Sequence, residues 1–272
     1  MLRGGKGMTL CRNVLLMCFF VASFVLSGVP ASSMAADRTH PDRHLLETAC
    51  AGGETLRYSI SWFGIKAGEL VIHTEALDRK AERFRIQVTA KSAGLLAVFY
   101  PVEDLFETIV EGPERLPVRY AIDQKEGARR NRKLTLYDQA RQQIIYTKND
   151  EKPIVYTVNG PVHNEFSSFM ILRAMPLVLG QSVIVSTFAD KKRYEVPVKV
   201  LSSHVVPSIL GKKPSLTVRP HLKFKGLYKK TGDPVIWLTD DEFRIPFRIK
   251  ARIVIGSLTA KLVEYHRDAE HI

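Results

Sequence analysis

GETLRYSISWFGIKAGEL, residues 53–70, is the stretch that decides the fold class of this 272-residue chain. Apolar side chains at Leu56, Tyr58, Ile60 and Trp62 alternate there with polar ones. Successive side chains of a strand point to opposite faces of a sheet, so this alternation is typical of a β-strand with one buried face. A turn over 64–68, with a glycine at each end, then leads into a second strand over 69–77.

The same period of two residues recurs along the chain and predicts further strands at 83–90, 116–123, 133–137, 143–147, 182–188, 194–201, 216–224, 235–239 and 247–255. Connections this short favour antiparallel neighbours, because a parallel crossover needs a dozen or more residues. No linker, internal repeat or low-complexity tract interrupts residues 53–272, so they are expected to form a single domain. We predict a mainly β fold, with one meandering antiparallel sheet that is strongly curved or open-barrel-like.

One segment breaks this period, because its spacing is helical at Phe166, Phe169, Met170 and Arg173. Asn164 precedes the segment as a favoured N-cap, and Pro176 follows it. The pattern predicts a short amphipathic helix that packs on the sheet, because it has no helical partner. Both phenylalanines are expected in the core together with Trp62 and Trp237. Arg173 would contact a ligand headgroup or pair with a strand carboxylate.

The N-terminal region has the pattern of a secretory signal peptide. Three basic residues precede an apolar run over 14–29, and the small side chains of Ser33 and Ala35 would allow cleavage between Ala35 and Ala36. An uncleaved anchor is the rival interpretation, but the run would cover only ~24 Å as a helix, and the hydrocarbon core is ~30 Å thick. We predict that residues 1–35 are a cleaved signal peptide, that residues 36–52 are a mobile leader, and that the protein is periplasmic.

The C-terminal third carries the most distinctive charge pattern. Cations occupy alternate positions at Lys223 and Lys225 and again at Arg248, Lys250 and Arg252, while Lys229 and Lys230 lie between the two runs. Side chains at i, i+2 and i+4 share one face of a strand, so they form a cationic stripe. Such a stripe would attract phospholipid or lipopolysaccharide headgroups of a Gram-negative envelope, and no nucleic acid is expected. The alternative is an ordinary solvated face.

Asp240, Asp241 and Glu242 cluster between two predicted strands and raise the question of an acid/base site. Catalytic carboxylates need an apolar pocket or a partner that separates their pKa values. Aspartates are favoured in turns because their side chains bond to nearby backbone amides. We therefore interpret 239–246 as a turn.

Motifs of known chemistry are absent from the sequence: it contains no GxSxG, HExxH, Walker loop, GxGxxG or CxxC. His40 with His44, and His163 with Glu165, are the closest approach to metal-ligand spacing, but a metal site needs three or four converging ligands. Cys50 would be alone after signal cleavage. No cofactor, metal or catalytic residue is predicted.

The chain resembles an uncharacterised family of exported bacterial proteins, one of the domain-of-unknown-function families. The resemblance covers 54–265 and rests on GETLRYSISWFGIKAGEL (53–70), LLAVFYPVEDLFETIVEG (95–112), SSFMILRAMPLVLGQ (167–181) and GLYKKTGDPVIWLTDDEFRIPFRIKARIVIGSLTAKL (226–262). It implies export and no particular activity. A curved antiparallel sheet with an inner helix is also similar, at the level of the fold, to lipoprotein carriers of the LolA/LolB type.

Three functions stay open at this point. The first is an envelope binding or carrier protein that holds an anionic, acyl-bearing ligand, with the headgroup at Arg173 and the cationic stripe. The second is a hydrolase or modifying enzyme of envelope polymers, which requires at least two titratable side chains to meet in a pocket. The third is an assembly factor without a small ligand.

Overall fold

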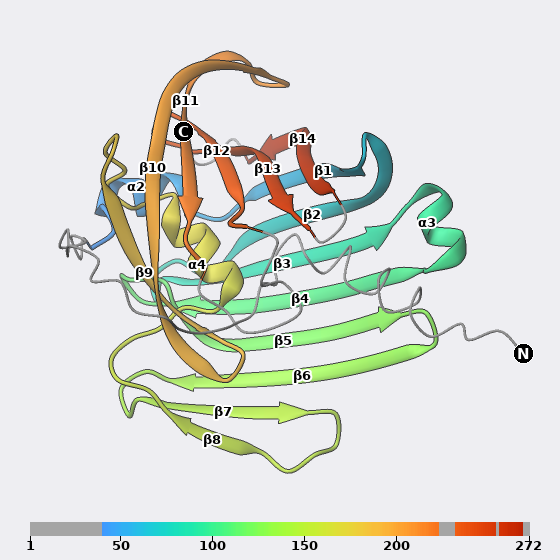
Figure 1. Cartoon of the computed structure of the whole chain (residues 1–272). Coiled ribbons are helices and arrows are strands. Elements are labelled where there is room, and N and C mark those ends of the chain that lie inside the picture. Colours follow the sequence, from blue (N-terminus) through green and yellow to red (C-terminus); the bar gives the residue numbers. More distant parts are fainter. Residues whose placement is uncertain (1–39, 223–231, 254–255, 269–272) are drawn as a thin grey trace, which may run out of the picture.

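The computed structural model describes residues 40–222, 232–253 and 256–268 (Figure 1). They form one 14-stranded sheet in the order β8-β7-β6-β5-β4-β3-β2-β1-β14-β13-β12-β11-β10-β9. Every pairing between neighbouring strands is antiparallel, and β8 and β9 are the two edges. The predicted fold class is therefore confirmed: the sheet meanders, curves and stays open.

The strands are β1 (Glu54–Trp62), β2 (Ile65–Asp78), β3 (Arg83–Ser92), β4 (Val102–Glu111), β5 (Leu116–Glu126), β6 (Arg129–Asp138), β7 (Gln143–Lys148), β8 (Ile154–Thr157), β9 (Ser182–Ala189), β10 (Lys192–Ser208), β11 (Gly211–Pro220), β12 (Val235–Thr239), β13 (Pro246–Arg252) and β14 (Ser257–Arg267). The helices are α2 (Arg43–Ala49), α3 (Gly94–Phe99) and α4 (Glu165–Leu172). None of these three helices is long and apolar enough to cross a bilayer.

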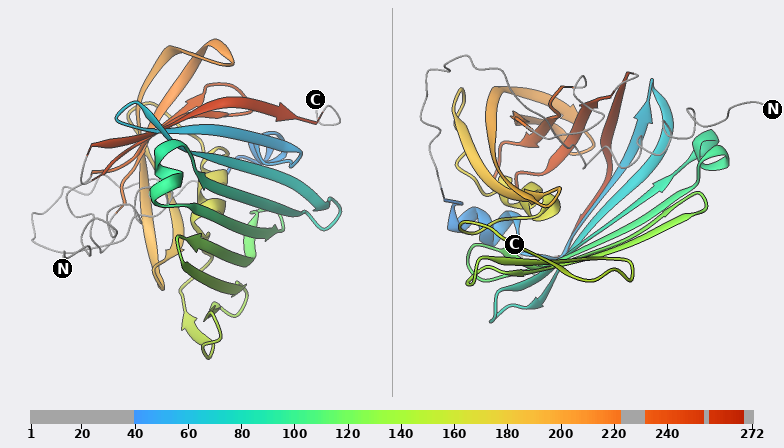
Figure 2. Two further views of the ribbon diagram at one scale, coloured as in Figure 1. Left: turned by 90° about the vertical axis from the view of Figure 1, so that its right-hand side faces the viewer. Right: turned by 60° about the horizontal axis from the view of Figure 1, so that its bottom comes forward.

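Most neighbouring strands are joined by short connections, but the pairing of β1 with β14 in the middle of the sheet brings together the first and last described strands. Across the opening between β8 and β9, the chain that follows β8 runs beside β9. There the backbone N–H of His163 donates to the Ser186 carbonyl at 2.8 Å, and the N–H of Phe188 donates to the His163 carbonyl at 2.7 Å. This segment leads directly into α4, which Figure 2 shows inside the curve of the sheet.

The predicted helix is confirmed as α4, and Asn164 caps it. The Asn164 side chain accepts hydrogen bonds from the backbone of Phe166 and Ser167, and it donates to Thr108 Oγ1 of β4 at 3.0 Å. Phe166 is 1% exposed, and its ring lies 5.0 Å from that of Phe106. Because cap and core contact come from the same short segment, α4 is fixed against β4.

Phe169 is also buried, as expected, but the two tryptophans are not. Trp62 and Trp237 are only partly buried. In β12 the buried positions are Ile236 and Leu238, so Trp237 points to the outer face, where the guanidinium of Arg248 lies 5.5 Å from its ring centroid. The expectation of a core Trp237 is therefore wrong, because the strand alternates in the other register.

The prediction of a mobile leader is wrong for residues 43–49, which form α2. The Asp42 carboxylate accepts from the Leu45 backbone and caps the helix, and Leu46 and Ala49 are buried. The Asp42 N–H also donates to the Ala174 carbonyl at 2.8 Å. Seven residues with so few buried positions are too short to show a helical period in the sequence. The proposed signal peptide and residues 36–39 lie outside the described residues.

The interpretation of 239–246 as a turn agrees with the structure. Asp241 Oδ1 accepts hydrogen bonds from the Thr239 hydroxyl at 2.6 Å and from the Arg244 backbone at 3.1 Å. This carboxylate therefore holds the turn between β12 and β13 together.

Candidate functional site

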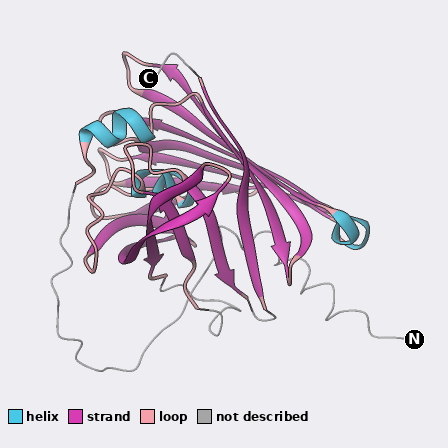
Figure 3. Cartoon of the chain, turned by 90° about the horizontal axis from the view of Figure 1, so that it is seen from above, coloured by secondary structure: helices cyan, strands magenta, loops and turns pink. Residues whose placement is uncertain are grey.

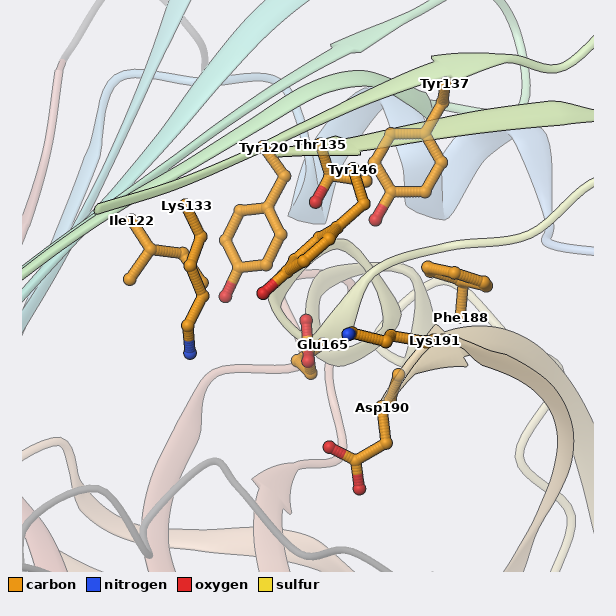
Figure 4. A pocket seen from close by; sticks show the side chains of 11 residues that line it. Tyr120, Ile122, Lys133, Thr135, Tyr137, Tyr146, Glu165, Phe188, Asp190 and Lys191 are labelled. Carbon is orange, nitrogen blue, oxygen red and sulfur yellow. The ribbon is translucent and has the colours of Figure 1, made fainter. Parts of the chain in front are cut away.

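A pocket of about 200 Å³ lies between the inner face of β5, β6 and β7 and the turn that joins β9 to β10 (Figure 4). The start of α4 forms its floor. Its lining combines aromatic rings with ionisable groups, namely Tyr120, Ile122, Lys133, Thr135, Tyr137, Tyr146, Glu165, Phe188, Ala189, Asp190 and Lys191. We call this the Glu165 pocket.

The alternation of side chains along β5 and β6 determines which residues form the upper wall of the pocket. Tyr120 and Ile122 are buried inner positions of β5, and Thr135 and Tyr137 are buried inner positions of β6. Lys133 lies two residues before Thr135, so it shares this inner face. A lysine at an inner position of a curved sheet is the first sign that the face is not wholly apolar.

The β9–β10 turn forms the opposite wall, and its backbone is strained. Asp190 and Lys191 both have left-handed φ, at 45° and 63°. Two-residue turns of this kind normally use asparagine, aspartate or glycine, so Asp190 is a favoured residue and the strain lies at Lys191. The strained turn places the Lys191 ammonium 5.1 Å from the ring centroid of Tyr146 on β7. Phe188, just before the turn, contacts Tyr137 edge to face at 6.3 Å.

Glu165, the first residue of α4, lies at the centre of the pocket. Burial raises the pKa of its carboxyl to about 7, an effect that outweighs the opposing attraction of Lys133. Its Oε2 and the Tyr120 hydroxyl are both buried, and apart from a weak interaction with each other neither has a hydrogen-bond partner. Figure 4 shows that hydroxyl pointing toward Glu165. Buried polar atoms are normally satisfied, so these two are available to a ligand or to water.

A chain of polar side chains leads away from the pocket along the inner face. Lys133 Nζ donates to Gln124 Oε1 at 3.3 Å, and Gln124 Nε2 donates to Asp104 Oδ2 at 3.3 Å. Burial lowers the pKa of Lys133 and raises that of Asp104 to about 6. The inner face therefore carries groups whose charge can change near neutral pH.

The arrangement in the Glu165 pocket can bind an anionic group. Lys133 and Lys191 supply positive charge, and a protonated Glu165 and the Tyr120 hydroxyl can both donate hydrogen bonds. Within the described ranges, no cluster of three or more His, Cys, Asp or Glu side chains could hold a metal ion.

Arg173, predicted as a possible headgroup contact, lies elsewhere. Its guanidinium is fully buried and forms two hydrogen bonds to Glu54 of β1, at 2.6 and 2.8 Å. It also donates to the Phe243 carbonyl at 2.9 Å. The structure therefore has the alternative pairing with a strand carboxylate, and this side chain is not accessible to a ligand.

The cationic stripe is divided. Lys223, Lys225, Lys229 and Lys230 lie outside the described residues. Lys250 and Arg252 of β13 join Arg219 of β11 around an outer groove of about 710 Å³, which we call the cationic groove. Arg248 lies away from it, over Trp237. These cations are on the outer face, whereas the predicted acyl-binding surface is on the inner face. A ligand whose acyl chain lies on the inner face therefore cannot place its headgroup on these cations.

Sequence analysis missed the residues of the Glu165 pocket. Glu165 was noted only as a neighbour of His163. The pocket brings together three consecutive strands, β5, β6 and β7, with the start of α4 and the β9–β10 turn. The one feature of the sequence that could have indicated the pocket was Lys133, a charged residue on the strand face that continues with Thr135 and Tyr137. No sequence motif could have indicated that Glu165 and the β9–β10 turn lie beside Lys133.

Comparison with known proteins gives a family and a fold. A crystal structure of a β-barrel-like protein of domain of unknown function DUF1849 from Brucella abortus has a TM-score of 0.50, with 9% identity over 80% of this chain and 98% of that one. The hypothetical protein CT021 from Chlamydia trachomatis matches with a TM-score of 0.37 and 9% identity over 78% of this chain and 87% of that one. No curated protein matches. The model of the family "Protein of unknown function (DUF3108)" matches residues 57–263, so the chain belongs to the DUF3108 family.

Proposed function

We propose that this protein is an exported envelope protein that binds one anionic, acyl-bearing amphiphile, of the phospholipid, lipoprotein or lipopolysaccharide class. The anionic group would lie in the Glu165 pocket, and the acyl chain would follow the inner face of the sheet. The observation that carries the proposal is the pocket itself, where two lysines and two buried polar atoms without a partner besides each other meet aromatic walls.

The inner face of the sheet extends well beyond α4. The helix has eight residues and is ~12 Å long, whereas the ten-residue β4 is ~33 Å long. Phe106 and Thr108 of β4 contact the α4 segment. Val102 and Asp104 are further inner positions toward the other end of this strand. Apolar inner positions also occur at Ile60 and Ala90 of the neighbouring strands. These positions are buried before any ligand binds, so an acyl chain would enter by displacing what covers them.

The chemistry of the pocket favours an anion that is bound together with a proton. With a pKa of about 7, the Glu165 carboxyl is partly neutral at physiological pH. A phosphate or carboxylate beside it would favour the neutral form further, because like charges repel. Affinity for the anion should therefore fall as the pH rises through 7. Export, which this function needs, is supported by the signal-peptide pattern of residues 1–35.

Native mass spectrometry of protein purified from its own envelope tests the proposal. We expect a co-purifying lipid whose occupancy falls in Lys133→Met and Tyr120→Phe and whose retention weakens from pH 6 to pH 8. Lys152→Met, an exposed position after β7, is the matched control and should keep the lipid. Absence of lipid from the wild type, combined with no displacement of a fluorescent fatty acid or phospholipid, would refute it.

A hydrolase of envelope polymers is a second candidate, because titratable side chains do meet in a pocket. A carboxyl with a pKa of about 7, as at Glu165, suits a general acid. Turnover of an envelope glycan or peptide polymer by the wild type, abolished in Glu165→Gln, would favour this candidate over a carrier. If neither lipid nor turnover is found, the assembly factor remains.

A further inference from the structure

Helix α3 is apolar, and none of its residues is buried. Its sequence is GLLAVF, and the exposed fractions of Leu95, Val98 and Phe99 are 72%, 76% and 79%. A helix in water normally buries its apolar side chains, and exposed apolar patches on soluble proteins mark interaction sites. Figure 3 shows α3 at one end of the sheet, far from the other helices.

The turn between β1 and β2 extends this apolar surface. The backbone N–H of Ala93, just before α3, donates to the Ala67 carbonyl at 2.9 Å and holds the helix beside β2. Phe63 and Ile65 in and after the turn are 64% and 69% exposed. We call Phe63, Ile65, Leu95, Val98 and Phe99 together the apolar rim; Figure 1 shows α3 on the right, with the turn between β1 and β2 above it.

Phe63 is held in an unfavourable conformation. Its φ is 50°, in the left-handed region that bulky residues rarely adopt. The residue gains little burial in return, because most of its surface is exposed. A strained, exposed aromatic residue at a turn points to a role outside the core.

Phe63 also links the apolar rim to the cationic groove. Its ring lies against Gly256, where an added Cβ would stand 2.5 Å from the ring. Gly256 itself lines the cationic groove together with Arg219, Lys250 and Arg252. Within the described ranges no ion pair involves these three cations, and the one carboxylate of the groove, Asp233, pairs with His221 at 2.6 Å. Apolar side chains and unneutralised cations therefore share one continuous surface.

We propose that the apolar rim and the cationic groove dock this protein on an anionic phospholipid bilayer. The apolar side chains would enter the boundary between headgroups and acyl chains, and the cations would contact lipid phosphates. Trp62, whose ring centroid is 5.3 Å from that of Phe63, is an aromatic type enriched at this boundary. The net charge of +12 disfavours a second copy of this chain, and strongly exposed apolar side chains beside cations match the layered chemistry of an anionic bilayer. Docking does not require a ligand in the Glu165 pocket.

Flotation with vesicles tests this surface. The wild type and each variant are purified from the protein's own host, and mass spectrometry checks the N-terminus of each. Each protein is mixed with vesicles of phosphatidylcholine alone and with vesicles that also contain phosphatidylglycerol. We expect salt-sensitive binding to the anionic vesicles. Phe63→Asn combined with Phe99→Ser should weaken it by roughly tenfold or more, since two large apolar side chains are lost. Asparagine tolerates the left-handed φ, so the turn is preserved.

Matched controls lie on other turns. Val205→Ser with Ile209→Ser removes two exposed apolar side chains of the β10–β11 hairpin and should leave binding unchanged. Lys250→Glu with Arg252→Glu should abolish the preference for anionic lipid, whereas Lys80→Glu with Lys212→Glu should not. Unchanged thermal unfolding confirms that each variant is folded. A wild type that does not bind anionic vesicles at low salt, or a rim variant that binds like its control, overturns the proposal, whatever the outcome for the Glu165 pocket.

Discussion

Removing one partner of the Arg173–Glu54 ion pair should destabilise the fold severely. The side chains are 0% and 2% exposed, and two hydrogen bonds of 2.6 and 2.8 Å join them. Arg173 follows α4, Glu54 begins β1, and the Phe243 carbonyl in the β12–β13 turn accepts a third bond. The pair therefore connects three parts of the chain that are far apart in sequence.

The magnitude follows from burial. Glu54→Gln keeps the shape but leaves a buried guanidinium without a counter-charge, and such losses cost about 3–5 kcal/mol. Arg173→Met leaves Glu54 unpaired instead and should cost a similar amount. The double variant Arg173→Met, Glu54→Leu removes both charges, and its cost should be only about 0–2 kcal/mol, because well-packed apolar replacements of buried pairs are often nearly neutral.

Urea unfolding measures these values. Each single variant should lower the midpoint at constant m-value, and the double-mutant cycle should give a coupling energy of several kcal/mol. Our reasoning is refuted if each single variant costs less than about 1 kcal/mol, or if the double variant costs the sum of the two. Either result would mean that water reaches the pair.

Four further predictions concern other parts of the molecule. Phe169→Ala should cost about 3–5 kcal/mol in urea unfolding, and a cost below about 1 kcal/mol would place α4 outside the core. Glu165 has a pKa raised to about 7, above its unfolded value of ~4.3. Its contribution to stability is therefore present below pH ~4 and is lost as the pH rises toward 7. Glu165→Gln should flatten this decline, by on the order of 1–3 kcal/mol, in unfolding curves measured from pH 4 to 8. Cys50 is partly exposed, but its thiol donates to the Met170 carbonyl and burial raises its pKa to about 11. Alkylation at pH 8 should therefore be slower in the folded than in the urea-unfolded protein, and equal rates would mean that the thiol is open to solvent. N-terminal sequencing should find Ala36 first, and recovery of an intact Met1 in membranes would exclude cleavage.

Most strands could be predicted from the alternation of apolar and polar residues, but β4, β8 and β14 were not. β4 was not predicted because two of its inner positions are polar. Asp104 accepts a hydrogen bond from Gln124, and Thr108 accepts one from Asn164. These partners come from β5 and from the residue before α4, so the reason for a polar inner side chain is visible only in the folded chain. The pattern of burial was also misread in β12, where Trp237 is the largest apolar residue but faces outward.

The functional surfaces were predictable only in part. The outer cations of β13 follow from alternation alone, because Lys250 and Arg252 must share a face. The Glu165 pocket does not, since it needs the curvature of the sheet and the strained turn at Asp190 and Lys191 to bring its walls together. The apolar rim lies in one turn, the first residue of β2 and a six-residue helix, and these segments are too short for exposure to be read from a period.

The pairing of β1 with β14 has a consequence for how the chain reaches this fold. Glu54 lies opposite Arg267, so the middle of the sheet is closed by two strands from opposite ends of the chain. Closing a flexible loop of that length costs roughly 5 kcal/mol of chain entropy before any contact repays it, so this join should form late. During folding β1 cannot gain this neighbour until β14, the last described strand, is added, so one edge of the β1–β8 half stays open until this late pairing.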